Sequence, residues 1–199
     1  MTRRPPLLAP LLAAALLAGC AGASAPPVPT VAALPTEMAG LRRTGEITDY
    51  EVAPGGAGLG ASVRYVSPPG AGRMVATVYV YDRRARQAPE GGGSPAVLDE
   101  LRRTHADAQA LTATGRYRAV TAPTGMDLGG RDVPPDMRCF AFGVIQGDGT
   151  RTGDGVCVSV RGGRFVKTRV TSWAPPEPVV AGVAAMALMN DALRAGAGR

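Results

Sequence analysis

Histidine, lysine and aromatic residues are scarce in this chain. Its 199 residues include one histidine, one tryptophan and three phenylalanines, and Lys167 is the only lysine. Because His105 has no second histidine with which to share a metal ion or a proton-transfer role, we expect a packed or half-exposed helix residue. The chain also lacks a Gly-x-Ser-x-Gly elbow and a glycine-rich loop that ends in Lys-Ser or Lys-Thr. No motif therefore assigns an enzymatic reaction, a metal or a cofactor.

A concentrated basic surface is missing as well. The formal net charge is +6, but no basic run is longer than two residues, and one of the densest clusters is Arg83-Arg84-x-Arg86. Nucleic-acid binding favours a continuous basic stripe with aromatic side chains on which bases stack. We therefore expect no nucleic-acid partner, and we interpret the arginines as solvated surface residues.

The first 20 residues have the organisation of an export signal. Arg3 and Arg4 precede an apolar run, Leu7–Ala18, of about 12 residues, which is too short for a membrane-spanning helix of about 20 residues. The run ends in Leu17-Ala18-Gly19-Cys20, which resembles the lipobox of bacterial lipoproteins. In that family the cysteine becomes the first residue of the mature protein and carries diacylglycerol and an N-acyl chain such as palmitate.

This resemblance implies a cellular location and a membrane as the partner. Cys20 would be lipidated, and the protein would be anchored to a membrane of the cell envelope, facing the periplasm or the exterior. An ordinary signal peptide that is cleaved near Cys20 is the alternative.

The composition divides the chain into three parts. Residues 1–19 are the predicted lipoprotein signal peptide. Residues 20–40 are rich in alanine and proline, which favour extended conformations and cannot build a core, so we predict a tether. Residues 41–199 are numerous enough for a single domain with a hydrophobic core.

The two remaining cysteines, Cys139 and Cys157, are predicted to form a disulfide. If Cys20 carries lipid, they are an even pair in an oxidising compartment. They lie in consecutive predicted strands, which we expect to be neighbours, and Gly143 and Ser159 are small residues on the same faces. The connection 147–155 is too irregular to define which residues stand opposite each other. Two buried free thiols are the alternative.

Alternation of apolar and polar residues predicts the strands. The segment 74–81 is apolar or aromatic on both of its faces, which indicates cover on both sides of the sheet. Arg161-Gly162-Gly163-Arg164 is typical of a two-residue hairpin turn and pairs Val160 with Phe165. The predicted strands are 61–66, 74–81, 116–121, 138–145, 156–160 and 165–173.

Two helices are predicted from their start signals and apolar spacing. Ser94 is a cap residue followed by Pro95 at the first helical position, and Gly115 ends this helix. The second helix spans 179–195. We expect its apolar face to lie against the sheet, and the residues of that face are Val179, Val180, Val183, Met186, Ala187, Met189 and Leu193.

Hairpins dominate this order of elements. The predicted fold class is therefore α+β, a mainly antiparallel sheet of about five to six strands with two helices packed on it. The order, the strand end Tyr79-Val80-Tyr81-Asp82 and the late hairpin 156–173 are similar to the PsbP/Mog1-like fold. A cystatin-like fold with fewer helices is the alternative.

Two classes of function are open. The first is a non-catalytic envelope lipoprotein that binds an envelope protein or a small ligand, or that has a structural role. The second is a hydrolase whose carboxylates converge from separate loops. The candidates for the second class are Glu46, Asp49 or Glu51 on one side and Asp127 or Asp136 on the other.

A calcium site is not expected in the segment 148–159. Asp148, Thr150, Thr152 and Asp154 alternate as calcium ligands do, but Ser159 stands at the twelfth position, where an EF-hand requires glutamate. Turn chemistry accounts for the glycines and aspartates of this segment.

Overall fold

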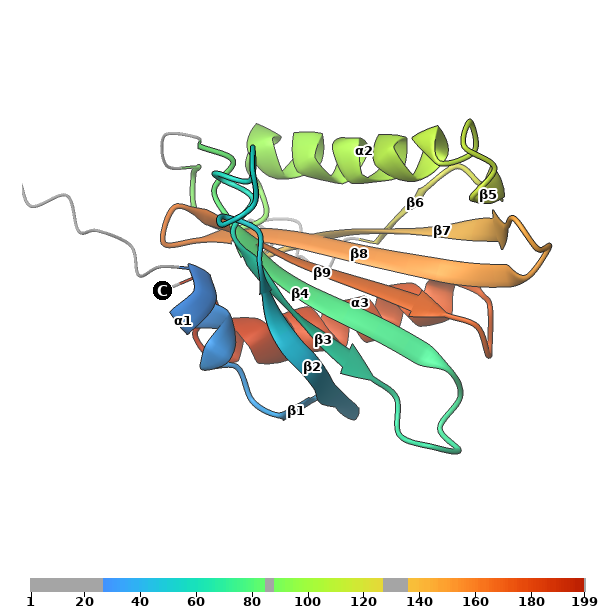
Figure 1. Cartoon of the computed structure of the whole chain (residues 1–199), viewed down its shortest axis with the longest axis horizontal. Helices are drawn as coiled ribbons and strands as arrows, with labels where there is room; N and C mark the ends of the chain where they lie inside the picture. Colours follow the sequence, from blue (N-terminus) through green and yellow to red (C-terminus); the bar gives the residue numbers. More distant parts are fainter. Residues whose placement is uncertain (1–26, 85–87, 127–135, 199) are drawn as a thin grey trace, which may run out of the picture.

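One antiparallel sheet with helices on both of its faces makes up the structure (Figure 1). This computed structural model describes residues 27–84, 88–126 and 136–198. The strands run in the order β1-β2-β3-β4-β9-β8-β7-β5, and β6 pairs with β7. The helices are α1 (Pro27–Ala32), α2 (Pro95–Ala110) and α3 (Pro178–Arg194). The strands are β1 (Glu37–Met38), β2 (Leu41–Asp49), β3 (Ala61–Val66), β4 (Met74–Tyr81), β5 (Tyr117–Val120), β6 (Thr124–Met126), β7 (Arg138–Gln146), β8 (Arg151–Arg161) and β9 (Arg164–Ser172).

The two faces of the sheet pack against different helices. α1 and α3 lie on one face, and α2 lies on the other (Figure 1). On β4, Val78 and Val80 belong to the core that contains Leu188 of α3, whereas Tyr81 belongs to the core that contains Leu101 of α2. The two-residue periodicity of a strand thus sends neighbouring side chains into opposite cores. The α+β class is confirmed. Cover on both faces of β4 is confirmed only at Tyr81, because Val75, Thr77 and Tyr79 on the α2 side are only partly buried.

The hairpins are confirmed at the level of register. β3 and β4 pair in an antiparallel hairpin over the predicted residues. In the β8–β9 hairpin, Val160 stands opposite Phe165, as predicted. Gly162 and Gly163 have φ angles of 56° and 73°, which is the left-handed region that a two-residue turn requires and glycine adopts without strain.

The sheet is larger than the predicted five to six strands, since nine strands are described. The strands that were not predicted are β1, β2 and β6. In addition, β8 begins at Arg151 rather than at 156, so the predicted connection 147–155 is wrong over its second half. Gly153 and Gly155, which favoured a loop, lie in the strand under α3. A Cβ atom on Gly155 would be 2.2 Å from the carbonyl oxygen of Ala181. These glycines therefore allow the helix backbone to contact the strand directly.

The face of α3 that packs on the sheet differs in part from the predicted one: Met186, Met189 and Leu193 pack against the core as predicted, but the valines do not. Val179 and Val183 are 57% and 53% exposed. The buried residues are mostly small: Ala181, Gly182, Ala185, Leu188, Met189 and Ala192. A helix that packs against glycines in a strand needs small side chains at the contact, and the larger valines point away. Within the described parts of the chain, no helix is long and apolar enough to cross a membrane.

The predicted tether over 20–40 is shorter than expected, because residues 27–40 are folded onto the domain. Val31 of α1 is fully buried, and Leu34 and Met38 are each 3% exposed. The hydroxyl of Tyr65 donates a hydrogen bond to the carbonyl oxygen of Pro35 at 2.8 Å. Three apolar side chains among the prolines thus suffice to hold this segment against the sheet. The earlier part of the segment lies outside the described residues.

Candidate functional site

α2 covers only part of its face of the sheet. Its main contacts are with β5, β7 and β8, and the side chains of β4 and β9 on the same face lie at the border of this cover. Tyr79 of β4 stands opposite Lys167 of β9. Because side chains alternate along a strand, Tyr81 and Arg169 share this face. Aromatic and cationic side chains therefore lie together at the edge of the area that α2 covers.

A buried carboxylate organises this border. Glu100 of α2 is 2% exposed. Its Oε1 accepts hydrogen bonds from the hydroxyl of Tyr81 at 2.6 Å and from Nζ of Lys167 at 3.2 Å. Arg83 donates from Nε to Oε2 at 2.6 Å and from Nη2 to Oε1 at 2.9 Å. One carboxylate thus fixes a tyrosine and two cations from separate segments.

The side chains above this carboxylate enclose a small pocket, which we call the Lys167 pocket. Its volume is about 240 Å³, and it is lined by Tyr50, Leu59, Tyr79, Tyr81, Arg83 and Lys167. Nζ of Lys167 lies 5.2 Å from the ring centroid of Tyr79 and 5.1 Å from that of Tyr81. Both distances are in the range of attraction between a cation and an aromatic face. The lysine is therefore held in place by a carboxylate and by two rings.

Burial and charge shift the pKa values in this cluster. Burial alone would raise the pKa of Glu100, but the hydrogen bond from Arg83 and the charge of Lys167 bring that pKa below its ordinary value. Burial lowers the pKa of Lys167, and Glu100 opposes this shift. Burial and the nearby Glu100 raise the pKa of Tyr81 well above its ordinary value. At neutral pH the carboxylate is therefore ionised, and the tyrosine keeps the proton that it donates.

A second buried ion pair lies further along β9. Arg169 donates to Oδ2 of Asp154 from Nε at 3.2 Å and also from Nη2, and Nη2 is 3.3 Å from the hydroxyl of Tyr117. A second hollow, of about 260 Å³, lies beside this pair, and Tyr79 lines both hollows. The two hollows therefore lie side by side, with Tyr79 in the lining of each.

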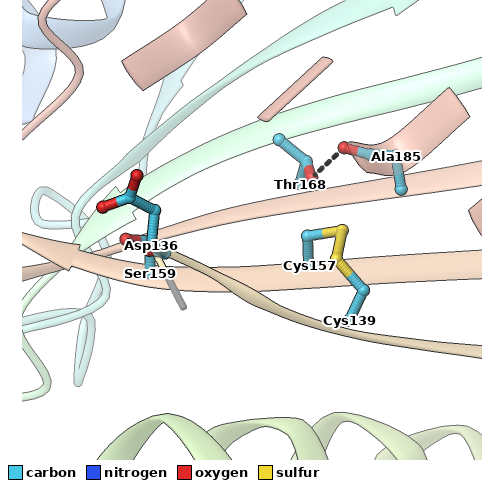
Figure 2. Close-up of a disulfide and its surroundings, with 6 residues drawn as sticks. All are labelled: Asp136, Cys139, Cys157, Ser159, Thr168 and Ala185. Atoms are coloured by element: carbon cyan, nitrogen blue, oxygen red, sulfur yellow. Dashed lines mark hydrogen bonds between the residues drawn. A yellow bond between two sulfur atoms is a disulfide. The ribbon is translucent and has the colours of Figure 1, made fainter. Parts of the chain in front are cut away.

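The predicted disulfide is confirmed. Cys139 of β7 and Cys157 of β8 stand directly opposite each other and are bonded (Figure 2). They are 1% and 0% exposed, in the core between the sheet and α3. The bridge is thus shielded from solvent and links two central strands. The other predicted modification site, Cys20, lies outside the described residues.

Glu51 and Asp136, two of the carboxylates predicted for a hydrolase, have separate structural contacts. Glu51 accepts hydrogen bonds from the backbone N–H groups of Gly58 and Gly60, the latter at 2.7 Å. Asp136 accepts one from Nη2 of Arg161 at 2.8 Å. The partners of Glu51 and Asp136 lie on different segments, the loop 58–60 and the strand residue Arg161, and Asp127 lies outside the described residues. The structure gives this constellation no shared site.

His105 and the aspartates of the segment 148–159 have ordinary structural roles. Nε2 of His105 lies 2.9 Å from the carbonyl oxygen of Thr121, and its ring packs edge-on against Phe142, which confirms a half-buried helix residue. Asp148 caps a turn through the backbone N–H of Thr150 at 2.8 Å, as predicted. Asp154, in contrast, is a buried strand residue, and its assignment to a turn is wrong. In residues 27–84, 88–126 and 136–198, no group of three or more His, Cys, Asp or Glu could hold a metal ion.

The chain was compared with known protein families, with curated proteins and with solved structures. None of them matches. The geometry of the Lys167 pocket is therefore the basis for a functional proposal.

Sequence reasoning missed this pocket because its members look like surface residues. Glu100 lies in a helix without any motif that marks it, and Arg83 was interpreted as a solvated surface residue. Both are drawn into the cluster instead. One signal was present in the sequence: the chain's only lysine lies in a predicted strand, directly after Phe165 and Val166. A lone lysine at such a position needs a partner, because burying an unpaired ammonium group is costly.

Proposed function

We propose that this protein is a lipid-anchored protein of the cell envelope that binds a small ligand in the Lys167 pocket and catalyses no reaction. The position of Lys167 carries the binding role. Its side chain is 15% exposed, at the wall of a concave pocket, between two tyrosine rings and above a buried carboxylate. Charged groups with shifted pKa values in a concave site are typical of functional sites.

The state of Glu100 supports binding rather than acid–base catalysis. Its two oxygens already accept four hydrogen bonds, one from Tyr81, two from Arg83 and one from Lys167. A general base needs a free lone pair and a pKa near the working pH, whereas the pKa of this carboxyl is lowered. The carboxylate therefore positions the cations and does not take up protons.

The proposal also includes a cellular location and a fold family. Leu17-Ala18-Gly19-Cys20 supports lipidation of Cys20, and the arrangement of an antiparallel sheet between helices supports the PsbP/Mog1-like assignment. Residues 20–26 would then be the tether between the lipid and α1. An anchored domain of this kind would present the Lys167 pocket to the space outside the cytoplasm.

Binding can be tested by ligand-induced stabilisation. We would measure thermal unfolding of the protein with a panel of anionic, neutral and cationic small molecules, half of them aromatic. A ligand at 100 times its Kd stabilises by about 2.7 kcal/mol. Leu59→Ala should reduce this stabilisation, because Leu59 lines the pocket and is 45% exposed, so that its loss costs little stability. Val52→Ala, an 80% exposed position outside the pocket lining, should leave it unchanged. A panel without any stabilising compound would refute the binding role.

Anchoring can be tested separately by mass. The membrane-extracted protein should begin at Cys20 and carry acyl chains, each of which contributes about 0.8 kcal/mol of membrane affinity per buried CH₂. Cys20→Ser should abolish the acyl mass and release the protein from membranes. An unmodified N-terminus at another residue would contradict the lipobox assignment.

A further inference from the structure

Charge is distributed unevenly around the Lys167 pocket. Two of its six lining residues, Arg83 and Lys167, are cations, and none of the six is acidic. The one carboxylate that both cations contact, Glu100, lies beneath the lining, and Nη1 of Arg103 is a third cationic atom within 3.8 Å of it. One negative charge therefore faces at least two positive charges. The surface of the pocket keeps a positive excess that a ligand can neutralise.

Hydrogen-bond donors are also left over. Arg83 donates to Glu100 from Nε and Nη2, and Lys167 donates a single N–H to it. A guanidinium group has five N–H donors and an ammonium group has three. No described residue accepts a hydrogen bond from Nη1 of Arg83. The two remaining N–H groups of Lys167 likewise have no acceptor among the described residues. Both cations line the pocket, so these donors are available to an anion within it.

The other walls of the pocket are flat or apolar. Tyr50, Tyr79 and Tyr81 present aromatic rings, and Leu59 adds an aliphatic group. The volume of about 240 Å³ is below the roughly 300–1,000 Å³ of pockets that hold drug-sized ligands. A ligand that uses both the rings and the cations is therefore small, has a flat apolar body and carries one acidic group.

We propose that the Lys167 pocket binds a small organic anion, an aromatic carboxylate in its simplest form, with the carboxylate on Lys167 and Arg83 and the flat body against the tyrosines. This inference rests on the proposed binding function and names the ligand class for the same site. Charge-assisted hydrogen bonds are the strongest polar contacts in such a pocket. Glu100 keeps the two cations in position, so that no rearrangement is required on binding.

The test uses three probes that separate charge from shape. Benzoate has both the charge and the ring, benzamide has the ring without the charge, and acetate has the charge without the ring. We expect benzoate to bind at least tenfold more tightly than either of the others, because it alone forms charge-assisted hydrogen bonds and also covers the rings. Titration calorimetry on the purified protein measures the three affinities.

Variants assign the preference to the named cations. Lys167→Met should reduce the affinity for benzoate toward that for benzamide, with Arg83 retaining part of the preference, and leave benzamide binding unchanged. Arg102→Met is the matched control, since Arg102 is an exposed arginine of α2 that pairs with Asp99 outside the pocket. It should not alter any of the affinities.

A second measurement does not depend on the folding of a variant. Protein that incorporates ¹³C-labelled lysine gives the side-chain signal of Lys167 alone, since it is the only lysine, and this NMR signal should shift with benzoate and not with benzamide. Equal binding of benzoate and benzamide would overturn the anion inference while the pocket remained a binding site. Equal binding of benzoate and acetate would overturn the aromatic part. Binding of none of the three, together with a negative panel, would overturn the proposed function as well.

Discussion

Replacing Glu100 with glutamine is the most informative perturbation of the cluster. The side chain keeps its shape, loses its charge, and exchanges an acceptor oxygen for an NH₂ group that would face donors of Arg83, Tyr81 or Lys167. Removal of one partner from a buried ion pair costs about 3–5 kcal/mol. Arg83 and Lys167 are 28% and 15% exposed, so water compensates part of the loss. We therefore expect Glu100→Gln to lower the free energy of unfolding by about 3 kcal/mol.

Urea unfolding of the two proteins measures this difference. Asp99→Asn is the matched control: it removes a carboxylate from the preceding position of α2, but that side chain is 63% exposed, and the expected change lies within about 0.5 kcal/mol. In a double-mutant cycle, Lys167→Met should cost less in the Glu100→Gln background than in the wild type, because the ammonium has then already lost its counterion. Equal losses for Glu100→Gln and Asp99→Asn would refute the assignment of Glu100 as the organising residue.

The same carboxyl predicts a pH dependence. The pKa of Glu100 in the folded protein lies below its ordinary value of 4.5, so the unfolded chain takes up a proton at higher pH than the folded protein does. The stability that Glu100 contributes is therefore complete above about pH 4.5 and is lost as the pH falls through the folded-state pKa. The difference in stability between the wild type and Glu100→Gln should decrease over this acidic range.

Three further perturbations test the packing. Gly155→Ala should destabilise by about 3 kcal/mol, because α3 must move away from β8. The control Gly125→Ala has open space around the added Cβ and should cost far less, so similar urea midpoints for the two variants would contradict the close helix–strand contact. The Cys139–Cys157 bridge should resist reductant in the native protein and be reduced after denaturation, and its removal should cost roughly 3 kcal/mol; thiols that can be alkylated without reductant would argue against the bridge. Asp154→Asn should destabilise by about 2 kcal/mol, because the carboxylate is 1% exposed and its loss leaves the partly buried guanidinium of Arg169 without a counterion. An unchanged unfolding midpoint would show that the pair contributes nothing.

Local patterns made most of the sheet predictable. β3 and β4 have the predicted bounds, because each alternates cleanly and the segment between them is rich in proline and glycine. The β8–β9 register followed from a two-glycine turn, which admits only one pairing of the residues next to it. Ser94 accepts a hydrogen bond from the N–H of Val97, so the cap of α2 was correct as well. In each of these cases the decisive interaction spans a few residues.

Contacts between distant segments could not be predicted in this way. The first half of β8 looked like a loop because its glycines are explained only by the backbone of α3, which follows much later in the chain. The proline-rich segment before β1 looked like a tether because three buried apolar side chains among prolines give no periodic signal. The Lys167 pocket is of the same kind, since Glu100 meets Arg83, Tyr81 and Lys167 across sequence separations of 17, 19 and 67 residues.

The location of the pocket follows from the alternation along β9. Val166 and Val170 point into the core beneath α3 and are fully buried, so Lys167 and Arg169 must point to the face that α2 covers only in part. A cation in that position can neither enter the apolar core nor move far from it, because its backbone is fixed between β4 and β8. A carboxylate supplied from the helix side, Glu100, allows the strand to keep its lysine at the border. That arrangement costs desolvation that an apolar residue would avoid, and the proposed anionic ligand would use the charge that the strand keeps there.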